Sequence, residues 1–109
     1  MKNDKLLSMI SLSNKAGKLV SGEFSVEKGV KEGKVLLVIV SKDASDNSTK
    51  SYKDMCTYYK VPIIFYSDKV TLGHIIGKEV RVSIGITDEG FSKAIMKLYD
   101  ENKDSEVSE

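Results

Sequence analysis

The apolar run VLLVIV at residues 35–40 most constrains the fold of this chain. Branched aliphatic side chains favour strands, and a strand that is apolar at every position must be covered on both of its faces. A run of six residues is far too short to span a bilayer as a helix. The run therefore predicts a central strand of a sheet with helices packed above and below it.

Further strands are expected on both sides of this run. Residues 62–66, PIIFY, form a short apolar stretch with proline at its start, where the missing N–H does least harm. Residues 80–86, VRVSIGI, alternate between apolar and polar positions, which is typical of a strand. Residues 18–21, KLVS, predict a short strand at the edge of the sheet.

Helices are predicted between these strands from the spacing of the apolar residues. Asp46 is expected to cap the third helix, and Thr87 or Asp88 the last one. Strands that alternate with helices indicate an α/β fold, here a three-layer α/β/α sandwich with a mixed sheet of about four strands. The side chains expected to face the core from the helices are Leu6, Leu7, Ile10, Val26, Val30, Tyr52, Cys56, Tyr59, Phe91, Ile95 and Leu98.

Length and charge suggest one domain followed by a tail. A chain of 109 residues fits a single core, which we place in residues 1–99. Residues 100–109 hold five acidic residues and one lysine, and we expect this tail to be disordered. Residues 1–99 carry sixteen basic and eleven acidic residues, a balance that is compatible with a nucleic-acid partner but is weak support for one.

Catalytic and metal sites are not expected. His74 and Cys56 are the only histidine and the only cysteine, too few ligands for a typical zinc site. His74 is expected at the surface of a short helix, and Cys56 in the core, where thiols are usually inert. The spacings of phosphate loops, dinucleotide sites and nucleophile elbows are missing, so we expect no cofactor and no enzyme activity. The single cysteine and the lack of a leader-like start predict a cytoplasmic protein without a membrane anchor.

The segment 22–33 is the candidate binding feature. Gly22 opens a short helix that carries several lysines, and a helix start offers free N–H groups and a partial positive charge to a phosphate. Lys15 and Lys18 lie just upstream and would complete a basic cradle around the helix start. In the alternative interpretation, Gly22 is a turn residue and the lysines form a solvated face.

The order and spacing of five segments resemble the kink-turn RNA-binding ribosomal protein family. These segments are GEFSVEKGVKEGK, VLLVIVSKDAS, YYKVPIIFY, LGHIIGKEVRVSIGIT and a final helix. The family includes the archaeal large-subunit protein seven-Ae and the eukaryotic protein thirty, and the likeness is greatest to its small bacterial members. It covers roughly residues 4 to 99.

The resemblance implies an RNA site at the start of the second helix. The family pattern there is Gly-x-Asn-Glu-x-x-Lys, and Gly22 and Lys28 match it. Phe24 and Ser25 replace the Asn and Glu that read base pairs in the family, so base readout must differ. Ser25 could bond a base edge, whereas Phe24 could stack on a base, wedge against one, or belong to the core.

Two loops complete the implied site. Residues 42–45 match the family's loop after the second strand, and residues 77–81 match the loop that packs against an extruded nucleotide. The implied partner is structured RNA of the kink-turn type, bound by a monomer that is ribosomal or ribosome-associated. The alternative is a protein-interaction module that kept the fold and lost this readout. The candidate RNA-binding residues are Lys15, Lys18, Gly22, Glu23, Phe24, Ser25, Lys28, Ser45, Lys78, Val80 and Arg81.

Overall fold

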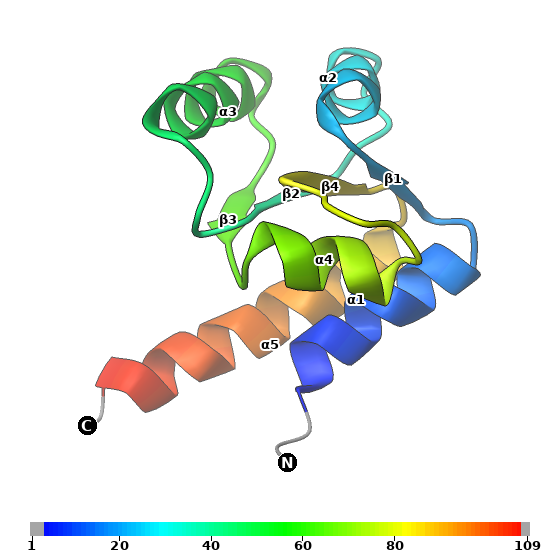
Figure 1. The fold of residues 1–109 in the computed structure, drawn as a ribbon, viewed down its shortest axis with the longest axis vertical. Helices are drawn as coiled ribbons and strands as arrows, with labels where there is room; N and C mark the ends of the chain where they lie inside the picture. The colour runs from blue at the N-terminus through cyan, green and yellow to red at the C-terminus, as the bar shows by residue number, and fades with distance from the viewer. Residues whose placement is uncertain (1–3, 108–109) are drawn as a thin grey trace.

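The computed structural model describes residues 4–107, and the side chains of residues 4–102, as a sheet with helices on both faces (Figure 1). Its element order alternates helices with strands, as the sequence predicted. The elements are α1 (Lys5–Lys15), β1 (Leu19–Ser21), α2 (Glu23–Lys31), β2 (Leu37–Val40), α3 (Asp46–Tyr59), β3 (Ile63–Phe65), α4 (Lys69–Ile75), β4 (Ser83–Ile86) and α5 (Glu89–Val107).

The sheet is mixed and has the strand order β1-β4-β2-β3. Strand β2 runs parallel to β3 and antiparallel to β4, and β4 runs antiparallel to β1. The expected central strand is therefore confirmed, with residues 37–40 all buried. The expected edge strand is confirmed as β1.

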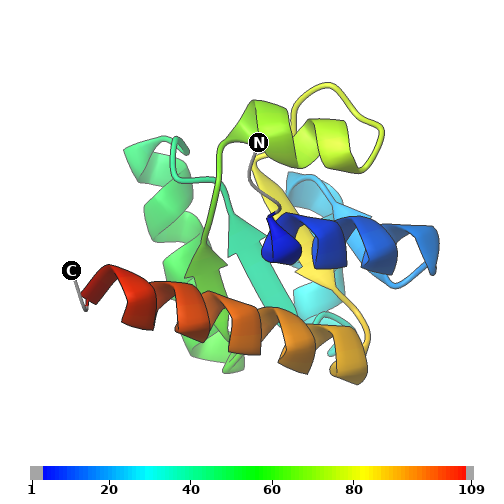
Figure 2. The ribbon, with the colours of Figure 1, turned by 90° about the horizontal axis from the view of Figure 1, so that it is seen from below.

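The two faces of the sheet have different side chains and different helices (Figures 1 and 2). Leucines and isoleucines of β2, β3 and β4 pack against α1, α4 and α5, whereas valines of β2 pack against α2 and α3. This arrangement confirms the three-layer α/β/α sandwich. The fully buried aliphatic side chains at its centre include Leu37, Ile39, Ile84, Ile86 and Val38.

Side chains that accept hydrogen bonds from backbone N–H groups fix where the helices begin. Ser45, rather than the expected Asp46, caps α3, because its hydroxyl accepts from Ser48 N at 3.1 Å. Asp46 is the first residue inside the helix, where a carboxylate favours the positive end of the helix dipole instead. Asp88 caps α5, as one of the two expected residues, and its carboxylate accepts from Phe91 N at 2.9 Å.

Helix α5 continues through residues 100–107, where we expected a disordered tail. Glutamate and lysine are good helix formers, and extending an existing helix avoids the cost of nucleating a new one. Asn102 also lies close to the body of the protein, since its Nδ2 donates to the Tyr66 hydroxyl at 3.4 Å. Residues 108–109 of the expected tail lie outside the described residues.

No helix within residues 4–107 has the length and apolar character that crossing a bilayer requires.

Candidate nucleic-acid interface

The topology brings three segments that are distant in sequence to one edge of the sheet. Strands β1 and β2 end where β4 begins, since Ser21 pairs with Ile84, and Val40 with Ser83. Hydrogen bonds continue past these strand ends: Gly22 N donates to the Ser83 carbonyl at 3.0 Å. The start of α2, the loop 41–45 and the loop 77–82 therefore meet at this edge, which we call the α2 edge.

Gly22 occupies a backbone conformation that other residues rarely adopt, with φ 92° and ψ 157°. The space in front of it is open, because a Cβ built there would find only Arg81 Nε, at 4.0 Å. Positive φ thus gives a conformational reason for glycine at this position, beside the predicted approach of RNA backbone.

The start of α2 is uncapped by any side chain. The first helical bond within α2 runs from Val26 N to the Gly22 carbonyl, at 3.0 Å. The N–H groups of Glu23, Phe24 and Ser25 therefore have no partner inside the helix, and they point along the helix axis toward the α2 edge. An acceptor that carries negative charge is stabilised at such a helix end.

The side chains of α2 divide into a buried and an exposed set. Val26 and Val30 are buried, as predicted, and Gly29 lies against Val35, which leaves no room for a Cβ. Phe24 is 76% exposed, so the core is excluded from the three alternatives left open for it. Lys28 is also exposed, and it follows Phe24 by four residues, so the two side chains are neighbours on the helix surface.

Arg81 is held beside Gly22 by two hydrogen bonds. Its Nε donates to Ser21 Oγ at 3.0 Å, and its Nη1 donates to the Val80 carbonyl at 2.7 Å. These bonds position a cation next to the open start of α2. The sequence suggested Arg81 as a candidate but could not show the contact with Ser21, which lies 60 residues away.

The loop 77–82 is packed tightly against α4. A Cβ at Gly73 would come within 2.8 Å of the backbone of Glu79 and Val80, so only glycine allows this approach. Lys78 N donates to the Gly73 carbonyl at 2.8 Å, which closes the turn. Val80 remains 43% exposed and Lys78 is exposed, so both side chains are accessible at the α2 edge.

The loop 41–45 is tied to α4 by Asp43. Asp43 Oδ1 accepts from Lys69 N at 3.1 Å. The pKa of the Asp43 carboxyl lies below its ordinary value. The main cause is the Ser41 hydroxyl beside it, and the Lys69 N–H contributes less. Ser45 is exposed in the same loop, but its hydroxyl is already engaged as the cap of α3.

Lys15 and Lys18 do not join the start of α2, so the expected basic cradle is wrong. The Lys18 carbonyl accepts from Thr87 N at 3.0 Å, which places Lys18 where β4 ends, at the opposite edge of the sheet from Gly22. Lys15 lies in the last turn of α1, which covers the other face of the sheet from α2. The prediction relied on nearness in sequence, but strand β1 separates these lysines from the start of α2.

His74 and Cys56, the two side chains considered for catalysis, lie on different helices. His74 is exposed on α4, whereas Cys56 is buried in α3, and burial raises the pKa of its thiol to about 11. Among the side chains of residues 4–102, no three of His, Cys, Asp or Glu are grouped as metal ligands would be.

Comparison with known families matches residues 4–96 to the ribosomal protein L7Ae/L30e/S12e/Gadd45 family. The chain belongs to this family. The family resemblance drawn from the sequence is therefore confirmed, and the L7Ae-type relatives include both bacterial and archaeal proteins.

Two curated relatives illustrate this range. RNA-binding protein YlxQ of Bacillus subtilis is 41% identical over 92 residues, which are 84% of this chain and 92% of the relative. Large ribosomal subunit protein eL8 of Thermoplasma acidophilum is 27% identical over 96 residues, 87% of this chain and 79% of the relative.

Solved structures agree with the L7Ae-type fold. A protein of unknown function from Bacillus halodurans superimposes with a TM-score of 0.86 at 40% identity, covering 90% of this chain and 99% of that one. The 15.5kD RNA binding protein of Giardia lamblia has a TM-score of 0.73 at 19% identity, covering 93% and 90% of the two chains, and supports the fold alone.

Proposed function

We propose that this protein binds structured RNA of the kink-turn type at the α2 edge, as a cytoplasmic monomer that performs no catalysis. Membership in the L7Ae family supports the proposal, as does the 41% identity to a bacterial protein named for RNA binding. The archaeal relatives are ribosomal proteins, so a ribosomal or ribosome-associated RNA is the expected target.

The observation that carries the proposal is the open start of α2 beside a fixed cation. Three N–H groups without a partner inside α2 and the guanidinium of Arg81 lie close to Gly22, where a Cβ would find only Arg81 Nε, at 4.0 Å. Backbone N–H groups and arginine are common phosphate ligands in protein–nucleic acid complexes. Lys28, farther along the same helix, would add a point charge to a neighbouring phosphate.

Base contacts at this site would come from Phe24 and Ser25. Phe24 is 76% exposed one residue from the helix start, and exposed aromatic rings stack on unpaired bases of RNA. Ser25 offers a hydroxyl that can donate to or accept from a base edge. Val80, 43% exposed in the loop 77–82, would supply apolar contact to an extruded nucleotide.

A second candidate function is a protein-interaction module, and the exposure of Phe24 is the observation that favours it. An aromatic side chain that no other residue covers is typical of an anchor in a protein interface. In this alternative, the α2 edge would bind a protein and leave a kink-turn unbound.

A gel-shift titration separates these functions. The full chain is titrated into a duplex that contains a kink-turn and, in parallel, into an uninterrupted duplex of equal length. The proposal predicts a clear preference for the kink-turn duplex. Equal affinity for both duplexes would contradict kink-turn recognition, and binding to neither would favour the protein-interaction module.

A further inference from the structure

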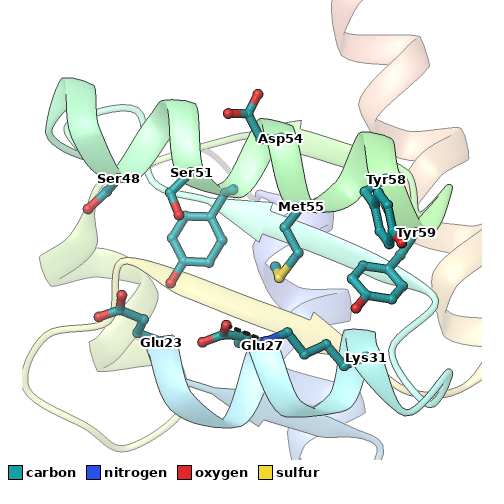
Figure 3. Close-up of a pocket in the computed structure, with 10 residues that line it drawn as sticks. Glu23, Glu27, Lys31, Ser48, Ser51, Asp54, Met55, Tyr58 and Tyr59 are labelled. Carbon is teal, nitrogen blue, oxygen red and sulfur yellow. Dashed lines mark ion pairs between the residues drawn. The ribbon is translucent and has the colours of Figure 1, made fainter.

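A groove of about 490 Å³ lies between α2 and α3 (Figure 3). Glu23, Glu27 and Lys31 of α2 form one wall, as Figure 3 shows. Met55 and Tyr59 of α3 point across the gap toward α2. The RNA-binding proposal uses the backbone N–H of Glu23, but it uses neither the Glu23 side chain nor the rest of this groove.

The α2 wall of the groove offers an unpaired negative charge. Lys31 Nζ contacts Glu27 Oε2 at 2.9 Å, which compensates one of the two glutamates. Among the described residues, no ion pair involves Glu23. Burial, and then the facing carboxylates of Glu23 and Glu27, raise the pKa of Tyr52, which lines the same groove.

Aromatic side chains stand at the α3 side of the groove. The ring centroids of Tyr58 and Tyr59 lie 4.8 Å apart at an interplanar angle of 77°. This edge-to-face contact packs Tyr58 against Tyr59, although Tyr58 is 77% exposed to solvent. Tyrosine faces attract guanidinium groups, and they do so most strongly where water is partly excluded.

A second hollow continues the groove past Lys31 and Tyr59, which line both spaces. This hollow of about 400 Å³ is mainly apolar, with Val30, Val35 and Pro62 among its lining residues. The groove is thus acidic near the start of α2 and apolar near its end. Glu23 and Lys31 are eight residues apart, or about 12 Å along the helix.

We propose that the groove between α2 and α3 binds an extended segment of a partner protein that carries an arginine and, about four residues away, an apolar side chain. The guanidinium would pair with Glu23 and contact a tyrosine face, and the apolar side chain would fill the second hollow. The spacing follows because an extended chain covers 12 Å in about four residues. RNA is a poor occupant, because its phosphates would face two carboxylates.

NMR titration of the full-length protein, labelled with ¹⁵N, tests this proposal. The probe is the peptide Ser-Gly-Arg-Ser-Thr-Ser-Leu-Gly-Ser, and the control peptide has citrulline, which is uncharged, in place of arginine. The expected result is shifts of amide resonances in residues 23–31 and 51–62 with the arginine peptide. The citrulline peptide should bind clearly more weakly.

Matched variants then test the charged wall. Glu23→Gln should weaken binding of the arginine peptide about fivefold, the loss expected for an exposed carboxylate–guanidinium pair. Tyr58→Ala should also weaken it. Glu89→Gln makes the same change in charge on α5, across the sheet, and should leave affinity unchanged.

Three results would overturn the proposal. The first is the lack of any shift at millimolar peptide, and the second is equal binding of the arginine and citrulline peptides. The third is a set of groove shifts that appears with a kink-turn duplex but not with the peptide, which would assign the groove to RNA.

Discussion

At the scale of single residues, three side chains of the α2 edge differ in their surroundings. Phe24 and Lys28 are exposed on one helix, whereas Arg81 is partly buried and already bonded to Ser21. An exposed side chain can be replaced without loss of packing, so its effect on binding can be measured separately from its effect on folding.

Lys28→Ala should weaken binding by about the same factor for kink-turns of different sequence, because a lysine provides a point charge to phosphate and reads no base. Counterion release predicts that the slope of log affinity against log salt falls by about one unit or slightly less. A salt titration of both proteins measures this. Lys97→Ala, an exposed lysine on α5, is the control and should change neither quantity. An unaltered slope in Lys28→Ala would show that Lys28 is only a solvated residue.

Phe24→Asn restores the residue type that the family pattern has at this position, and it should strengthen binding to a kink-turn duplex. The free energy of unfolding should change by less than about 0.5 kcal/mol, because the ring is 76% exposed. Denaturant melts and gel shifts of the same preparation provide both measurements. A loss of binding would contradict this prediction, and it would show that stacking of the Phe24 ring on a base contributes more than the contacts of the family's asparagine.

Cys56 should resist alkylation in the folded protein. Burial raises the pKa of its thiol to about 11, so the thiolate that reacts is scarce at pH 8, and the sulfur is also inaccessible. Iodoacetamide at pH 8 should modify the thiol slowly in buffer and rapidly in denaturant, as followed by mass spectrometry. Equal rates in both conditions would mean that α3 opens readily.

At the scale of elements, the sequence predicted what depends on local pattern and missed what depends on topology. Residues 35–40 identified the central strand because six consecutive apolar side chains, four of them β-branched, leave few alternatives. The contacts between Arg81 and Ser21, and between Asp43 and Lys69, join segments whose meeting depends on strand order and direction. The cradle of Lys15 and Lys18 failed for the same reason.

Cap positions were also only partly predictable, because neighbouring residues compete for them. Ser45 and Asp46 both have side chains that suit a helix start, and the structure gives the cap to Ser45. The sequence left Phe24 between an RNA contact and the core, because its position in the family pattern suggests the RNA site whereas a phenylalanine by itself suggests the core.

Gly22→Ala tests how far the turn from β1 into α2 depends on glycine. A residue with Cβ is strained at φ 92° and ψ 157°, so we expect a loss of about 1–3 kcal/mol in the free energy of unfolding. Steric conflict with neighbours should add little, because the nearest atom to a Cβ would be 4.0 Å away. Urea denaturation measures the loss. An unchanged stability would indicate that the turn relaxes to negative φ, in which case the start of α2 should move.

At the scale of the whole molecule, charge is distributed unevenly along the chain. Residues 1–99 hold sixteen basic and eleven acidic residues, whereas residues 100–109 hold five acidic residues and one lysine. Helix α5 includes residues 100–107 of this segment and packs on the face of the sheet opposite α2 (Figures 1 and 2). The segment therefore influences RNA at the α2 edge only through long-range electrostatics, which salt screens.

Deleting residues 101–109 should consequently have a small effect on folding and a salt-dependent effect on binding. Among the described side chains, the deletion removes one tertiary hydrogen bond that the structure resolves, from Asn102 to the Tyr66 hydroxyl at 3.4 Å, at an exposed position. We expect a loss of less than about 1 kcal/mol in the free energy of unfolding, or a few degrees in melting temperature.

RNA affinity of the shortened protein should rise at low salt and return to the full-length value at high salt, because four acidic residues and one lysine are removed. Calorimetry and gel shifts at two salt concentrations measure these effects. Asn102→Ala in the full chain is the control that separates the hydrogen bond from the charge. A large fall in melting temperature would show that the end of α5 docks on the domain, and an affinity gain that persists at high salt would show direct competition with RNA.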